Sequence, residues 1–259
     1  MGHSAKILKE ERLVLSARPE VILVGDSHVL ALAQGCEALG RNAAMLKSGG
    51  IHWNQGKIRV YRPNRERSPF MPAMQGQVND LEAQMDTTDI FDGSVPVIAS
   101  IGFHCGHLTR AFGAHGHVAW PPPDGLSDQE TEEALFASNA AVAAFVEDRR
   151  QRHFRLLSYI ASRCRLTAIL PPRAPKNETK IRFRHNLDAL TDAITVRLES
   201  RGIDVYDPNT EFVEQDKLLP WDWVNDDGFH GTPEYGKSVV QTLIARGAFD
   251  RVANEQKEK

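Results

Sequence analysis

Residues of the three types that together perform acyl transfer stand at two distant points of the chain. Ser27 follows the apolar run Val21 to Val24 and Gly25, and Asp227 stands three positions before His230. A carboxylate bound to one imidazole nitrogen fixes the tautomer, so that the other nitrogen can take a proton from a serine hydroxyl. These residue types predict a Ser-His-Asp site with Ser27 as nucleophile, provided that the fold joins the two points.

The surroundings of Ser27 predict a junction between a strand and a helix. Four consecutive apolar residues are typical of a strand buried on both faces of a parallel sheet. Helical spacing begins at Val29 and ends at Gly40. Ser27 would then lie beside free backbone N–H groups and the positive end of a helix dipole. A purely structural role is the alternative, because Asp and Ser are also common helix N-caps.

The segment with Asp227 and His230 directly precedes a predicted C-terminal helix. Thr232 is a good N-cap and Pro233 suits the first helical position. Apolar residues follow at helical spacing: Tyr235, Val239, Val240, Leu243 and Ile244. In a doubly wound sheet, the end of the first strand and the segment after the last strand open on the same carboxyl edge. Ser27 and His230 are therefore expected to meet.

The remaining chain alternates between strands and helices. Apolar runs predict four further strands, at residues 42–46, 95–101, 166–170 and 203–206. The spacing of Ser127 and Glu130 predicts a capping box for a helix that reaches about residue 163, with a bend near Ser138 and Asn139. A helix around 187–198 precedes Gly202. This alternation predicts an α/β protein whose parallel sheet is covered on both sides.

The length of 259 residues predicts a single domain over 1–259. Loop insertions are expected at about 51–92, with a short helix near 78–85, and at about 104–127. The tail at about 254–259 is expected to be disordered.

Composition indicates an ordinary globular protein, with 41% hydrophobic residues, 25% charged residues and a formal net charge of −3. Such a charge gives no general attraction for nucleic acid or an anionic membrane, and no apolar run approaches the length of a membrane span. Three cysteines argue against a disulfide framework. The polar N-terminus lacks the apolar segment of a signal peptide, so a cytoplasmic location is expected. The sequence does not predict the oligomeric state.

Short motifs recur in the order and spacing of a known family. Gly25-Asp26-Ser27 after the first strand, glycine after the second and third strands, and Asp227-x-x-His230 before the last helix resemble the SGNH (GDSL-type) hydrolases. The resemblance spans the whole domain. It implies a three-layer α/β/α fold with a five-stranded parallel, flavodoxin-like sheet. It also implies hydrolysis of esters of small acyl groups, carbohydrates or lipids without a cofactor.

The resemblance assigns roles to individual residues. Ser27 would be the nucleophile, His230 the general base and Asp227 its orienting partner. Backbone N–H groups of Ser27 and of Gly50, or of its neighbour Gly49, would form the oxyanion hole.

The chain departs from the family pattern at the third oxyanion donor. The family has an asparagine two residues after the glycine of the third strand, here Gly102, and this chain has His104. A histidine in the right tautomer can still donate one hydrogen bond. A protonated His104 would be a stronger donor, but it would repel the imidazolium that forms at His230.

Four further residues are candidates for substrate contacts: Asp26, Trp53, Trp223 and Arg173. Aromatic faces suit a sugar ring or an acyl chain, although tryptophans near a core edge are at least as often packing residues. An arginine can hold an anionic group, but a surface position explains Arg173 better. A histidine-rich stretch has residue types that bind zinc: His104, Cys105, His107, His115 and His117. Its spacing matches no zinc pattern, so no metal is expected.

The sequence thus predicts a serine esterase or deacylase that acts on an O-acyl ester of a carbohydrate or small lipid. An O-acyltransferase with the same triad is the alternative within enzymes, because the difference lies in the exclusion of water from the acyl-enzyme. A ligand-binding domain without catalytic activity is the alternative outside enzymes. It is retained because His104 stands where the family has its asparagine donor.

Overall fold

A five-stranded parallel sheet forms the centre of the protein. The computed structural model describes residues 18–48, 72–101, 105–114, 116–122, 124–173, 181–212 and 219–251. The strands lie in the order β2-β1-β3-β6-β7 and are β1 (Val21–Gly25), β2 (Ala43–Lys47), β3 (Val97–Ser100), β6 (Leu166–Ile169) and β7 (Asp204–Tyr206). The strand order reverses between β1 and β3, as in flavodoxin-like sheets, which confirms the predicted fold class.

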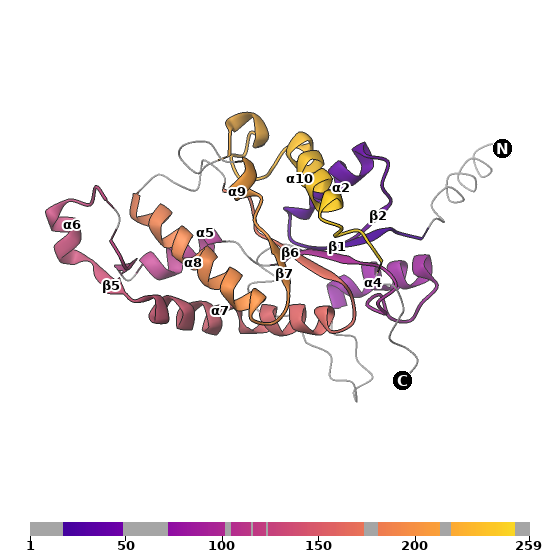
Figure 1. Ribbon diagram of the computed structural model, residues 1–259, viewed down its shortest axis with the longest axis horizontal. Helices are drawn as coiled ribbons and strands as arrows, with labels where there is room; N and C mark the ends of the chain where they lie inside the picture. The colour runs from indigo at the N-terminus through magenta and orange to yellow at the C-terminus, as the bar shows by residue number, and fades with distance from the viewer. Residues whose placement is uncertain are drawn as a thin grey trace.

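Helices cover both faces of this sheet (Figure 1). The described helices are α2 (Val29–Ala38), α4 (Pro72–Met85), α5 (Cys105–Gly113), α6 (Asp128–Glu133), α7 (Asn139–Ala161), α8 (Ile181–Glu199), α9 (Asn209–Phe212) and α10 (Pro233–Ala245), of which α6 lies away from the sheet. Helices α2 and α10 lie side by side on one face, and α4 and α7 lie on the other. The protein therefore has three layers, with helices on both sides of the sheet.

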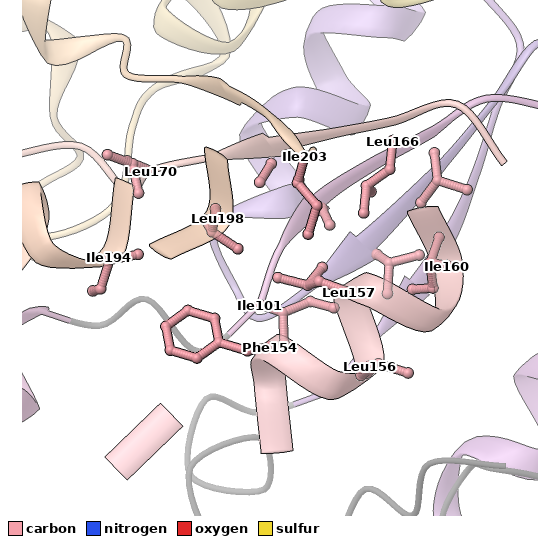
Figure 2. Packing of buried hydrophobic residues seen from close by; sticks show 14 of the residues in the cluster. Ile101, Phe154, Leu156, Leu157, Ile160, Leu166, Leu170, Ile194, Leu198 and Ile203 are labelled. Atoms are coloured by element: carbon pink, nitrogen blue, oxygen red, sulfur yellow. The ribbon is translucent and has the colours of Figure 1, made fainter. Parts of the chain in front are cut away.

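Alternate residues of β1 supply the two separate cores. Val21 and Leu23 are fully buried among side chains of α2 and α10, whereas Ile22 and Val24 are buried on the face of α4, α7 and α8. Figure 2 shows the core on the face of α4, α7 and α8, where labelled side chains of α7 and α8 pack near strand β6. A strand with both faces buried reads as a continuous apolar run, so the burial explains the sequence pattern before Ser27.

Helices α2 and α10 approach each other backbone to backbone. A Cβ atom at Gly236 would lie 1.8 Å from the carbonyl oxygen of Ala31, and one at Gly35 would lie 2.4 Å from the carbonyl oxygen of Gly236. Only glycine permits such close contact. Because α2 follows Ser27 and α10 follows His230, this crossing fixes the separation of the two predicted catalytic residues.

The long helix predicted from residue 127 to 163 is wrong as one element. The capping box of Ser127 and Glu130 is present, but it starts only the short α6. Strand β5 (Leu135–Ala137) follows, and α7 then starts anew with the Ser138 hydroxyl accepting from the Ala141 N–H. The expected bend is therefore a complete interruption, because the backbone of β5 pairs with another strand and cannot continue a helix.

Regular structure also occupies the segments expected as loop insertions. Helix α4 begins at Pro72, earlier than the predicted helix at 78–85, while residues 51–71 lie outside the described residues. Helix α5 and strand β4 (His117–Ala119) lie within the segment 104–127. Strand β4 pairs in parallel with β5 in a small second sheet that the sequence did not predict. The predicted disordered tail at 254–259 lies outside the described residues.

A buried side-chain amide on α8 forms hydrogen bonds with the small sheet. The Asn186 side chain, 1% exposed, accepts a hydrogen bond from the Ala119 N–H at 2.9 Å and donates one to the His117 carbonyl at 3.0 Å. The amide thus replaces a neighbouring strand at the edge of β4.

Within the described ranges, no helix combines the length and the apolar character needed to cross a bilayer.

We expect Gly236→Ala to lower the free energy of unfolding by about 3 kcal/mol, because the new methyl group overlaps the backbone of α2. Gly76→Ala in α4 is the matched control, since a Cβ atom there meets nothing within 4 Å and alanine favours the helix by about 0.5–1 kcal/mol. Urea unfolding curves measure both changes. Equal stability of the two variants would contradict the close helix crossing.

Candidate active site

Ser27 lies where β1 ends and α2 begins, against strand β3. A Cβ atom at Gly25 would lie 2.4 Å from the Ser100 carbonyl oxygen, so glycine is needed for the close approach of the two strands. The Asp26 N–H donates to the same oxygen at 3.2 Å, and the Leu30 N–H donates to the Ser27 carbonyl at 3.2 Å. Strand order reverses between β1 and β3, which is where doubly wound sheets open a crevice for ligands.

Asp26, a predicted substrate contact, is buried beneath this turn. The residue is 1% exposed, and its Oδ1 accepts the His28 N–H at 3.0 Å. This bond stabilises the turn that presents Ser27. A direct contact between Asp26 and a substrate stays a prediction.

The segment that carries Asp227 and His230 is a short hairpin. Val224 and Gly231 form an antiparallel bridge, and the Asn225 N–H donates to the His230 carbonyl at 2.8 Å. Gly228 has a φ of 72°, a left-handed conformation that glycine adopts without strain. The hairpin turns the Asp227 side chain back toward His230.

The Asp227 carboxylate binds three groups of this hairpin. Its Oδ1 accepts the backbone N–H groups of Phe229 at 2.8 Å and of His230 at 3.0 Å. Its Oδ2 lies 2.5 Å from Nδ1 of the His230 imidazole. The carboxylate therefore fixes the tautomer with hydrogen on Nδ1 and leaves Nε2 as an acceptor.

The structure brings this imidazole to the Ser27 hydroxyl. The distance between His230 Nε2 and Ser27 Oγ is 2.6 Å, although 203 positions separate the two residues. The His230 side chain is 34% exposed and the Asp227 side chain 47% exposed, so water reaches the pair. A hydroxyl, an imidazole and a carboxylate thus form one hydrogen-bonded chain that can move a proton from oxygen to nitrogen.

The Asp227 carboxyl group is held in its charged form. Burial acts to raise its pKa, but the hydrogen bonds from the His230 ring and from the backbone N–H groups of His230 and Phe229 outweigh this effect. They lower the pKa of Asp227 to about 2.

Two cysteines of the described part are poor nucleophiles. Burial raises the pKa of the Cys36 thiol to about 12 and that of the Cys164 thiol to about 11. Both stay protonated at neutral pH, and a thiol reacts as its thiolate. The Ser27 hydroxyl, by contrast, has an imidazole base at hydrogen-bond distance, which makes it the better candidate for the nucleophile.

Only one of the predicted oxyanion donors lies within the described residues. The backbone N–H of Ser27 donates to none of the described groups. Gly49, Gly50 and His104 lie outside the described residues, as does the predicted substrate contact Trp53.

The other two predicted substrate contacts pack against protein groups. The Trp223 ring lies 5.1 Å from that of Phe212 and 6.1 Å from that of Tyr235. The Arg173 guanidinium lies 2.5 Å from the Asp188 carboxylate of α8, and its side chain is 13% exposed. These contacts stabilise the fold, and direct substrate binding by either residue stays a prediction.

The histidine-rich stretch shows no metal centre in the part of the chain that can be described. No group of three potential ligands is found there. His117 instead contacts the Phe112 ring edge-on at 5.4 Å. His104 and His115 lie outside the described residues, and so do the side chains of Cys105 and His107.

One residue of the site was not predicted from the sequence, His28. Its ring centroid lies 5.0 Å from that of His230. Its place next to Ser27 was the only available signal, because a single histidine at the start of a helix has no distinctive pattern.

We expect a carbon-detected NMR titration to give a pKa of about 2 for the Asp227 carboxyl group and a value closer to the ordinary one, about 3.9, in His230→Ala. Because the folded pKa is the lower one, the contact adds stability above about pH 4 and loses it as the pH falls through 2. A wild-type value near 4 would disprove the charged hydrogen-bonded pair.

Comparison with known proteins gives likeness in structure only. No family model and no curated protein matches the chain. Solved structures that resemble it include a phospholipase A1 from Streptomyces albidoflavus NA297, which is 15% identical with a TM-score of 0.45 and covers 90% of this chain and 100% of its own. An extracellular lipase from Streptomyces rimosus is 13% identical, with a TM-score of 0.46 over 88% of this chain and 98% of its own.

A third structure is a GDSL-like lipase from Bacteroides thetaiotaomicron VPI-5482, 13% identical, with a TM-score of 0.44 over 96% of this chain and 98% of its own. At these values the likeness carries no statement about activity. The resemblance to the SGNH hydrolases accordingly depends on the chain's own residues, Gly25-Asp26-Ser27 and Asp227-x-x-His230.

Proposed function

We propose that this protein is a serine esterase or deacylase of the SGNH type, which hydrolyses a carboxylic O-acyl ester. The observation that carries this proposal is the continuous hydrogen-bonded chain from Ser27 Oγ to His230 Nε2, at 2.6 Å, and from His230 Nδ1 to Asp227 Oδ2, at 2.5 Å. The resemblance of the motifs to SGNH hydrolases supports an acyl group on a carbohydrate or small lipid as the substrate.

The first half of the reaction forms an acyl-enzyme. His230 Nε2 takes the hydroxyl proton as Ser27 Oγ attacks the ester carbonyl carbon, and the carbonyl electrons move to its oxygen. The backbone N–H of Ser27 can donate to this oxyanion. The tetrahedral intermediate collapses, the bond to the leaving alcohol breaks, and His230 returns its proton to the alcohol oxygen.

The second half releases the acid. His230 takes a proton from water, whose oxygen attacks the acyl carbon, and Ser27 leaves with the proton from His230. Asp227 stays ionised throughout because its pKa is about 2, and its negative charge stabilises the imidazolium in both halves.

Solvent exposure of the pair supports hydrolysis over acyl transfer to a second alcohol. An acyltransferase must keep water from the acyl-enzyme. In this structure the side chains of His230 and Asp227 are 34% and 47% exposed. Water is therefore the acceptor that we propose.

We expect Ser27→Ala to lower kcat/KM for p-nitrophenyl acetate by at least about a thousandfold, because it removes the atom that forms the acyl-enzyme. Ser162→Ala is the matched control. Ser162 ends α7 just before β6 begins, so it lies at the amino ends of the strands, away from the carboxyl ends that carry Ser27. Thermal unfolding checks that both variants are folded. Wild-type turnover by Ser27→Ala would exclude this mechanism.

Sugar acceptors distinguish hydrolysis from transfer. We expect acetate release from p-nitrophenyl acetate to equal p-nitrophenol release, with or without added mono- and disaccharides, because water enters freely. Mass spectrometry of the sugars measures any acetylated product. Acetylated sugar as the main product would instead favour the O-acyltransferase.

A further inference from the structure

His28 is a second imidazole at the candidate active site, and the proposed ester hydrolysis does not use it. The centroids of the His28 and His230 rings lie 5.0 Å apart, with their planes tilted by 42°. Ring pairs in contact have centroid distances between about 4.5 and 7 Å. Both residues are partly buried, so the contact lies at the rim of the site.

The backbone of His28 is firmly attached to the sheet. Its N–H donates to Asp26 Oδ1 at 3.0 Å, and the Asp26 N–H donates to the Ser100 carbonyl of β3 at 3.2 Å. Asp26 itself is 1% exposed. Because His28 directly follows Ser27, one short piece of backbone carries both the nucleophile and the ring that contacts its base.

The His230 imidazole needs a contact of this kind. Its hydrogen bonds join two ring atoms, Nδ1 to Asp227 and Nε2 to Ser27. Imidazole nitrogens form such bonds in the plane of the ring. Two such bonds leave the ring able to tilt about the line that joins them. A neighbouring ring restricts that tilt, while other parts of His230, 34% exposed as a side chain, meet water.

We propose that His28 is a positioning residue for the ester reaction: its ring packs against the imidazole of His230 and keeps Nε2 directed at the Ser27 hydroxyl. This inference rests on the proposed function, because it names what supports the base of that reaction. Contacts between rings change an equilibrium by about two- to tenfold, which sets the size of the expected effect.

Kinetics of four proteins test the role of the ring. We expect His28→Ala to lower kcat for p-nitrophenyl acetate by about fivefold and to leave KM within about twofold, because the proposed role of the ring is to position His230 and not to bind substrate. His28→Phe keeps a ring in place and is expected to restore kcat to within about twofold of the wild type. Gln34→Ala, an exposed position of the same helix, is the matched control and is expected to leave both constants unchanged.

An NMR measurement without substrate gives a second, independent result. The proton between His230 Nδ1 and Asp227 is expected to give a low-field signal that persists in the wild type and in His28→Phe. In His28→Ala the signal is expected to broaden or vanish, because the ring can tilt. Thermal unfolding checks that each variant is folded, and His28→Ser replaces His28→Ala if the latter is not.

The outcomes separate this inference from the proposed function. Retention of the wild-type kcat or of the low-field signal in His28→Ala, or failure of His28→Phe to restore kcat, overturns the role of His28. Unchanged turnover in Ser27→Ala overturns the proposed function instead, and the NMR comparison then decides alone about His28.

Discussion

The contact between the backbones of α2 and α10 is the constraint on which the candidate site depends. Ser27 stands two residues before the start of α2, and His230 stands three residues before the start of α10. Glycines at positions 35 and 236 let the two helix axes approach until carbonyl groups of one helix lie beside Cα atoms of the other. Packed helices behave as rigid bodies on this scale, so the crossing sets the separation of the hydroxyl and the imidazole.

The helix crossing sets only the distance between Ser27 and His230, because Asp227 and His230 lie on the same hairpin. Asp227, Phe229 and His230 lie on one hairpin, and the carboxylate binds two backbone N–H groups of that hairpin as well as the imidazole. This unit would keep its internal geometry wherever the hairpin is placed. Within the triad, the bond from His230 Nε2 to Ser27 Oγ is the one that joins distant parts of the chain.

Sequence patterns predicted what depends on local and periodic signals. The apolar run of β1 and the Thr232-Pro233 start of α10 predicted both elements, and the carboxyl-edge rule for parallel sheets predicted that Ser27 and His230 meet. The small sheet was missed because a three-residue strand such as Leu135–Ala137 has too few residues to show a period. Its partner strand and the amide of Asn186 are distant in sequence.

The parts of the site that the sequence could not predict share one property, dependence on close approach between separate elements. Gly35 and Gly236 lie within ordinary helical patterns, and nothing in either helix alone indicates that the other touches it. The same holds for His28, whose ring contact exists only because the hairpin of His230 lies over the start of α2.

In the proposed reaction, the nucleophile and one oxyanion donor belong to the same residue, Ser27. The Ser27 N–H donates to no group of the described chain, and the Ser27 hydroxyl lies 2.6 Å from His230 Nε2. The turn between β1 and α2 places both this N–H and the residue that carries the hydroxyl, and donors placed in advance are the ones that stabilise an oxyanion. The proposed activation of Ser27 uses only residues 27, 227 and 230, and all three lie in the described part of the chain.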